Sequence, residues 1–163
     1  MDSITTIKIN HSSILAYKVK LLQSFTYHSD FTRGSREREL LEETIKLVQK
    51  QKSVMYLVTK DDEYLGIISL SASSINDIPS SQVDYLFVDY NYRKQILSEL
   101  NHYTVSKFLI LLAIQVCEKI RENIGLKYLA LYPDGQSKTL MTHYKEELEF
   151  KQLDKEWLFI KLN

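Results

Sequence analysis

Apolar residues recur along the chain with two different periods, and these periods predict alternating strands and helices. Spacings of three and four residues, typical of a helix with one buried face, run through 14–25, 35–48 and 104–120. The third stretch carries the widest apolar stripe, which predicts a central, buried helix. Ser12 or Ser13 and Ser35 precede the first two stretches and suit helix N-caps.

Apolar runs rich in β-branched and aromatic residues predict the strands. The predicted strands are 6–9, 53–59, 64–71, 82–90, 126–132 and 156–162, and an amphipathic helix is predicted over 137–148. Four polar residues, 60–63, separate the second and third strands, so we expect an antiparallel hairpin there. The order is therefore βααβββαβαβ, an α/β pattern.

The strand over 82–90 is expected to present two different faces. Alternation places Val83, Tyr85 and Phe87 on one face of this strand and Asp84, Leu86 and Val88 on the other. The polar segment 76–81 before it is expected to be a loop.

The chain is expected to form a single domain over residues 1–163. Only four Gly and two Pro interrupt its 163 residues, and no Ser-, Gly- or Pro-rich stretch is long enough to act as a linker. A chain of this length buries roughly 70% of the surface that it exposes when unfolded. It can therefore fold without disulfides or a structural metal.

Charge and composition narrow the function classes. Twenty-one Lys plus Arg balance twenty-one Asp plus Glu, so no whole-surface attraction draws the chain to nucleic acid or to an anionic membrane. Residues 1–14 are too polar for a secretory signal, and we expect a cytoplasmic protein with no membrane partner. Cys117 stands alone and the four histidines lack metal-ligand spacing, so no metal is expected.

Several short segments, each weak alone, together resemble the GNAT acetyltransferase superfamily. They are 83–88, 92–94, 106–109, 124–129, Tyr144 ahead of Phe150, and 157–162. The resemblance covers nearly the whole chain. It implies a central mixed, mostly antiparallel sheet in which one parallel pair of strands splays apart.

In this superfamily the splayed strand pairs its backbone with the pantetheine arm of acetyl-CoA, and the resemblance assigns that part to Leu86, Phe87 and Val88. The pyrophosphate would lie at the N-terminus of the central helix, where unpaired N–H groups favour anions. The family's loop before this helix carries glycines, whereas here Tyr103 and Val105 stand in their places.

Two interpretations of this glycine-free loop stay open. In one, a remodelled loop still binds acetyl-CoA, and Arg93, Lys94 or Lys107 supplies positive charge. In the other, the pyrophosphate site is lost, and Tyr103 and Val105 pack into the core. The residues assigned to the remodelled site are Arg93, Lys94, Tyr103, Thr104, Val105, Ser106 and Lys107.

The resemblance also implies two catalytic residues. Tyr144 occupies the place of the tyrosine that protonates the departing thiolate, and Asp84 lies near an acidic residue that accepts the amine proton in some members. The family's closing pattern is one residue shorter between Tyr144 and Phe150 and has glycine where Glu149 stands. A purely structural role for Tyr144 is the alternative.

These assignments imply an N-acetyltransferase that moves an acetyl group from acetyl-CoA to a primary amine by direct attack in a ternary complex. The helices 14–25 and 35–48 and the loop 76–81 would form the acceptor site. A small-molecule or peptide amine is the expected acceptor; nucleic acid is not expected, although aminoacyl-tRNA stays open, as does a homodimer. The alternative function is a catalytically silent GNAT scaffold that binds a ligand or a protein.

Overall fold

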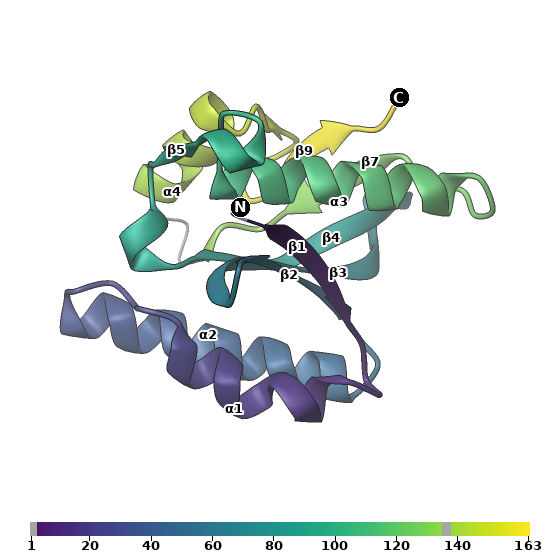
Figure 1. The fold of residues 1–163 in the computed structure, drawn as a ribbon. Coiled ribbons are helices and arrows are strands. Elements are labelled where there is room, and N and C mark those ends of the chain that lie inside the picture. Colours follow the sequence, from purple (N-terminus) through teal and green to yellow (C-terminus); the bar gives the residue numbers. More distant parts are fainter. Residues whose placement is uncertain (1–2, 135–137) are drawn as a thin grey trace.

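A seven-stranded sheet divides the molecule into layers, with two helices on one face and two on the other (Figure 1). The computed structural model describes residues 3–134 and 138–163. In chain order the main elements are β1 (Ile4–Ile9), α1 (Ile14–Ser24), α2 (Phe31–Gln49), β2 (Val54–Lys60), β3 (Glu63–Ile75), β4 (Ile78–Val88), α3 (Val105–Arg121), β7 (Tyr128–Leu131), α4 (Lys138–Thr142), β8 (Lys151–Gln152) and β9 (Leu158–Lys161). Helices α1 and α2 cover one face of the sheet, and α3 and α4 lie on the other.

The sheet has the order β1-β2-β3-β4-β7-β9-β8. Every neighbouring pair is antiparallel except β4 and β7, which run parallel. The expected mixed, mostly antiparallel α/β fold is confirmed. The parallel pairing is short, joining Ser80–Val83 to Tyr128–Leu131, whereas β4 continues to Val88.

Two apolar cores hold the layers together. One lies between the sheet and α3, where Val105, Leu109, Ala113 and Cys117 are fully buried at helical spacing. The other lies between the sheet and helices α1 and α2. The predicted central helix therefore forms because its whole apolar stripe is buried against the sheet.

The structure corrects two sequence predictions at element ends. Helix α2 begins at Phe31 rather than after Ser35, because the Asp30 side chain accepts a hydrogen bond from the Arg33 amide and caps the helix. The expected loop 76–81 is a hairpin, in which β3 and β4 stay paired as far as Ile75 and Ile78. Its turn, with positive φ at Asn76 and Asp77, lies at the opposite end of β4 from Val88.

A bulge at Asp84 changes which residues of β4 share a face. The register with β3 shifts between the pairs Leu70–Val83 and Ser69–Tyr85, which leaves Asp84 as the extra residue. The expected alternation is therefore wrong across the bulge. Val83, Leu86 and Val88 pack in the α3 core, whereas Tyr85 and Phe87 pack in the core of α1 and α2.

Gly66 allows the end of β4 to pack closely against β3 and α3. A Cβ atom there would lie 2.7 Å from the Phe87 carbonyl oxygen and 3.0 Å from a methyl group of Val105. We expect Gly66→Ala to lower the free energy of unfolding by about 1–3 kcal/mol, because backbone and core must both shift. Urea unfolding of the purified variant measures this.

Gly125→Ala is the matched control, because nothing lies within 4 Å of a Cβ atom at that position. It should stay within about 0.5 kcal/mol of the parent chain. Equal effects of the two substitutions would contradict the close packing assigned to Gly66.

Candidate functional site

The parting of β4 from β7 creates the site. The two strands pair as far as Val83 and Leu131, and in the described sheet β7 offers no partner to β4 beyond that point. On its other edge β4 stays paired with β3 through Val88. The β7-facing edge over residues 84–88 is therefore available to a ligand that carries amide groups. Leu86, Phe87 and Val88, the predicted cofactor residues, lie along it.

Aromatic packing holds this part of β4 against the α1–α2 layer. The Phe87 ring makes an edge-on contact with Phe25, with ring centres 4.9 Å apart, and lies near Tyr27 and Tyr85. Phe87 is buried, so its side chain is a structural anchor. Only its main chain can face a ligand in the gap.

Tyr144 lies in a single π-helical turn, His143–Glu147, that follows α4. The backbone here closes wide turns, with the Leu148 amide donating to the His143 carbonyl and the Phe150 amide donating to the Tyr144 carbonyl. A π turn accommodates one additional residue in a helix. The extra residue between Tyr144 and Phe150 is absorbed in this way, and the two rings pack edge to face.

The Tyr144 side chain is almost completely buried. Burial, and then the carboxylate of Asp134, raise the pKa of Tyr144 to about 12. The phenol therefore stays protonated at neutral pH. The protonated hydroxyl carries a proton that it can donate.

Tyr85 lies close enough to Tyr144 for the two phenols to interact electrostatically. Burial first, and then the Glu37 carboxylate, raise the pKa of Tyr85 well above its usual range, and Tyr144 adds to this shift. The Tyr85 hydroxyl donates to the main-chain carbonyl of Glu37 on α2 at 3.1 Å. Sequence reasoning missed this residue as a site component because its place depends on the bulge at Asp84.

Arg93, a predicted cofactor residue, is engaged by the protein itself. Its guanidinium group makes two 2.9 Å hydrogen bonds to the Glu37 carboxylate, and its Nε donates to the Val88 carbonyl at 2.9 Å. The same group stacks over Phe87 and Tyr90. Arg93 thus ties the end of β4 to α2. Its partner Glu37 carries no sequence signal beyond being one of several acidic residues on that helix.

The connection from β4 to α3 is a remodelled loop. It contains the short strands β5 (Ile96–Leu97) and β6 (Tyr103–Thr104), which pair with each other, and positive φ angles at Asn101 and His102 turn the chain between them. Thr104 caps α3 by accepting a hydrogen bond from the Lys107 amide. The helix therefore begins at Val105 without the glycines that the family pattern carries.

The structure separates the residues predicted in this loop. The Val105 side chain is buried in the core, whereas Tyr103 and Lys94 are exposed and Ser106 is nearly buried beside Thr104. The Lys107 ammonium group is paired with Glu149 at 3.0 Å. Glu149 itself has a φ of 63°, a left-handed conformation that favours the glycine of the family pattern.

Asp84 is the bulged residue at the start of the gap. One carboxylate oxygen accepts a hydrogen bond from Ser53 at 2.8 Å and the other accepts one from Ser71 at 2.9 Å. Burial raises the pKa of Asp84, and the two serine hydrogen bonds partly oppose that rise. The carboxylate therefore links β4 to β3 and to the residue that precedes β2.

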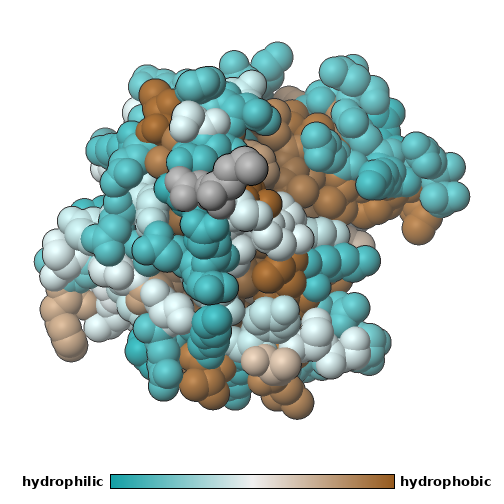
Figure 2. Space-filling model, in the orientation of Figure 1, coloured by the Kyte–Doolittle hydropathy of each residue, from teal (hydrophilic) through white to brown (hydrophobic). Residues whose placement is uncertain are grey.

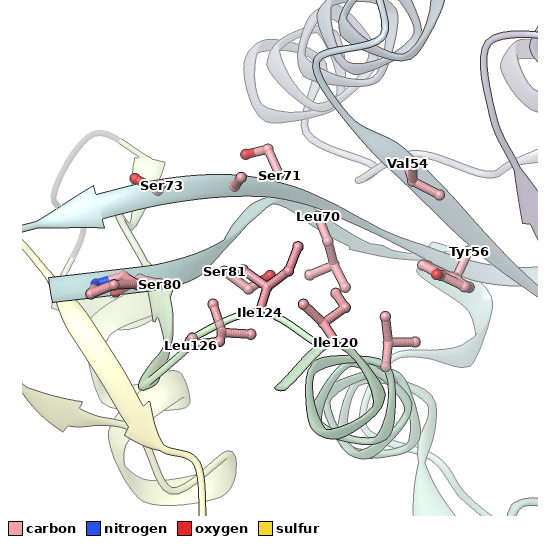
Figure 3. A pocket seen from close by; sticks show the side chains of 14 residues that line it. Val54, Tyr56, Leu70, Ser71, Ser73, Ser80, Ser81, Ile120, Ile124 and Leu126 are labelled. Atoms are coloured by element: carbon pink, nitrogen blue, oxygen red, sulfur yellow. The ribbon is translucent and has the colours of Figure 1, made fainter. Parts of the chain in front are cut away.

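An apolar groove of about 330 Å³ lies at the opposite end of α3. Ile120 in the last turn of α3 and Ile124 just after that helix, with Leu70 and Ser81 from the sheet, point into it (Figure 3). Brown, apolar surface is visible over this end of the molecule in Figure 2. None of the predicted catalytic or cofactor residues lines the groove, although Pro79, Ser80 and Ser81 of the predicted acceptor segment do.

Neither a metal centre nor a membrane span is found in the described parts of the chain. Across residues 3–134 and 138–163, no group of three His, Cys, Asp or Glu side chains is placed to hold a metal ion. None of the helices in those ranges is long and apolar enough to cross a membrane.

Comparison with known proteins gives whole-chain similarity at the level of structure. No family profile and no curated protein matches the sequence. A structure of AtaTR with acetyl-CoA matches with a TM-score of 0.74 and 18% identity, covering 99% of this chain and 95% of that one. AtaT complexed with acetyl-methionyl-tRNAfMet matches with a TM-score of 0.69 and 16% identity, covering 98% of this chain and 95% of that one. A KacTA–DNA complex matches with a TM-score of 0.68 and 16% identity, covering 98% of this chain and 94% of that one. The chain has the GNAT fold, which confirms the fold that the sequence resemblance implied.

One expectation from the sequence is corrected by these matches. We expected a small-molecule or peptide acceptor and considered nucleic acid unlikely, with aminoacyl-tRNA left open, but AtaT is bound to an acetylated aminoacyl-tRNA and the AtaT–AtaR complex is bound to DNA. Another structure has an AtaT variant bound to part of its antitoxin. A net charge of zero was a poor argument against nucleic acid, because it reports the sum over the surface and not its local distribution.

The buried Asp84 carboxylate makes stability depend on pH with a definite sign. Because the folded-state pKa is raised, the folded chain holds this proton more tightly than the unfolded chain, whose Asp pKa is about 3.9. Its stabilising contribution is full below that value and is lost as pH rises through the folded pKa. Asp84→Asn removes the titration, so the variant should gain stability relative to the parent chain as pH rises from about 4 toward neutral.

Urea unfolding of both chains across this range measures the difference. Ser71→Ala is the control, because it removes one hydrogen bond to the carboxylate and keeps the titrating group. A stability difference between Asp84→Asn and the parent chain that does not change with pH would contradict the assignment.

Proposed function

We propose that this chain is an acetyltransferase that moves an acetyl group from acetyl-CoA to the α-amino group of an aminoacyl-tRNA. The observation that carries the proposal is the gap between β4 and β7 with the buried Tyr144 phenol near it, in a fold shared over the whole chain with AtaT. AtaT itself is bound to acetyl-CoA in one structure and to acetyl-methionyl-tRNAfMet in another. These similarities support the substrate class.

The chain's own groups suit the binding of acetyl-CoA in this proposal. The open β4 edge offers main-chain groups of Leu86 and Phe87 to the amides of pantetheine. The first amides of α3, after the Thr104 cap, face the pyrophosphate, and Lys107 supplies positive charge if it leaves Glu149. Arg93 contributes by holding β4 in place.

Transfer requires three events at the gap. The neutral amine attacks the thioester carbonyl, a main-chain N–H near Phe87 stabilises the oxyanion, and the C–S bond breaks. Tyr144 then gives its proton to the departing thiolate. A phenol with a pKa raised to about 12 is fully protonated beforehand, and the thiolate is formed beside it. Tyrosine-to-phenylalanine variants of AtaT and of KacT are among the matching structures.

Asp84 is the proposed acceptor of the proton that the amine loses, through water. It lies at the start of the gap, and a carboxylate that accepts two serine hydroxyls keeps further lone pairs available. Asp84→Asn should therefore lower kcat by roughly 100-fold at neutral pH. Ser71→Ala, which keeps the carboxylate, should leave kcat near that of the parent chain. An unchanged kcat in Asp84→Asn would leave Asp84 with its structural role alone.

Transfer of radiolabelled acetyl from acetyl-CoA to bulk aminoacyl-tRNA tests the proposal directly. The expected product is N-acetyl-aminoacyl-tRNA, identified by mass spectrometry of the aminoacyl adenosine released by nuclease. Deacylated tRNA is the control and should accept no label. Saturable acetyl-CoA binding without transfer to any aminoacyl-tRNA would favour the silent scaffold instead.

The role of Tyr144 is tested by Tyr144→Phe in the same assay. We expect kcat to fall by roughly 100-fold while the dissociation constant for acetyl-CoA changes less than about twofold, because only the proton donor is removed. Tyr56→Phe is the matched control, since Tyr56 is also partly buried but lines the apolar groove. Full activity of Tyr144→Phe would show that its ring is structural.

A further inference from the structure

One exposed ion pair joins α2 to the segment that follows β7. The Arg36 guanidinium group on α2 binds the Asp134 carboxylate, which follows β7, with N–O distances of 2.9 Å and 3.3 Å. The two residues are 98 positions apart in the sequence, and both side chains are about two-fifths exposed. The pair therefore joins the α2 layer to the end of β7 at the surface of the molecule.

Each partner of this ion pair lies near a residue of the proposed active site. Asp134 is close enough to Tyr144 to contribute to its raised pKa. Arg36 is the neighbour of Glu37, whose main-chain carbonyl accepts the hydrogen bond from Tyr85. Asp134 also follows, by three positions, Leu131, the last residue of β7 that pairs with β4, so the ion pair lies just beyond the point where the two strands part.

The pair has the geometry of a replaceable contact. Its guanidinium group binds the carboxylate through two N–H groups, an arrangement that serves a phosphate equally well. An exposed ion pair contributes little to stability, so exchanging one anion for another costs little. Arg33, one turn earlier on α2 and exposed, adds positive charge on the same side.

We infer that Arg36 is a specificity residue that binds a backbone phosphate of the acceptor strand, and that Asp134 occupies the guanidinium group until the RNA arrives. The inference rests on the proposed function. In an aminoacyl-tRNA the reactive amine is attached to the terminal adenosine, so the nearest phosphodiester is one nucleoside away from the reacting atom. An amino acid or a small amine has no such group, and Arg36 then stays with Asp134.

The inference predicts opposite effects for the two partners. Arg36→Gln should raise KM for aminoacyl-tRNA about tenfold, because a charge-assisted hydrogen bond to phosphate is lost. Asp134→Asn should lower the same KM about threefold, because Arg36 then keeps only its longer 3.4 Å ion pair with Glu39 on the same helix. In the double variant, KM for aminoacyl-tRNA should equal that of Arg36→Gln alone. Neither change should alter KM for acetyl-CoA.

Arg38→Gln and Glu42→Gln are the matched controls, since Arg38 and Glu42 form a similarly exposed ion pair on the same helix. Neither should change KM for aminoacyl-tRNA by more than about twofold. For a second substrate, an aminoacyl-adenosine without a phosphodiester, KM should change with neither Arg36→Gln nor Asp134→Asn. Steady-state kinetics at fixed, low salt provide all of these values.

The outcomes separate this inference from the proposed function. If both single variants raise KM for aminoacyl-tRNA, the ion pair has only a structural role and the inference is overturned. It is also overturned if the parent chain is active and Asp134→Asn leaves KM for aminoacyl-tRNA unchanged. A parent chain that transfers no acetyl group to aminoacyl-tRNA overturns the proposed function and the inference together.

Discussion

The parting of β4 from β7 after four paired residues is the constraint on which the rest of the structure depends. Once β4 loses its neighbour, something else must hold its last five residues in place. Pairing with β3 does so along one edge, the Phe25–Phe87 contact does so on one face, and Arg93 ties the Val88 carbonyl to Glu37 on α2. These contacts hold the end of β4 in place although one of its edges is open.

Three local departures from regular geometry shape the segments around β4 and α3, which lack the glycines of the family pattern. The small β5–β6 hairpin replaces a tight connection into α3, and the π turn absorbs an extra residue before Phe150. Glu149 adopts a left-handed backbone, which costs a residue with a side chain about 1–2 kcal/mol, and its carboxylate is paired with Lys107. Side-chain contacts thus stabilise backbone conformations that glycine would adopt at no steric cost.

Local charge arrangement carries more functional information here than net charge. The totals cancel, yet Arg93 is partly buried against Glu37 while Arg36 lies in an exposed pair with Asp134. Salt screens exposed charges beyond about 8–10 Å, so an acceptor responds to the few charges beside its path rather than to the whole surface. A neutral chain is therefore compatible with an RNA substrate.

The sequence by itself determined the order of the main elements and the buried central helix, because apolar periodicity is a local property of the chain. Its resemblance to a known fold implied the open stretch of β4 and made Tyr144 a candidate. Only the tertiary structure decided which faces β4 presents, since the bulge at Asp84 arises from its register with β3. It also decided the partners of Arg93, Lys107 and Arg36, which lie 56, 42 and 98 positions away. Pairing over such separations follows from how the layers pack, and no local pattern records it.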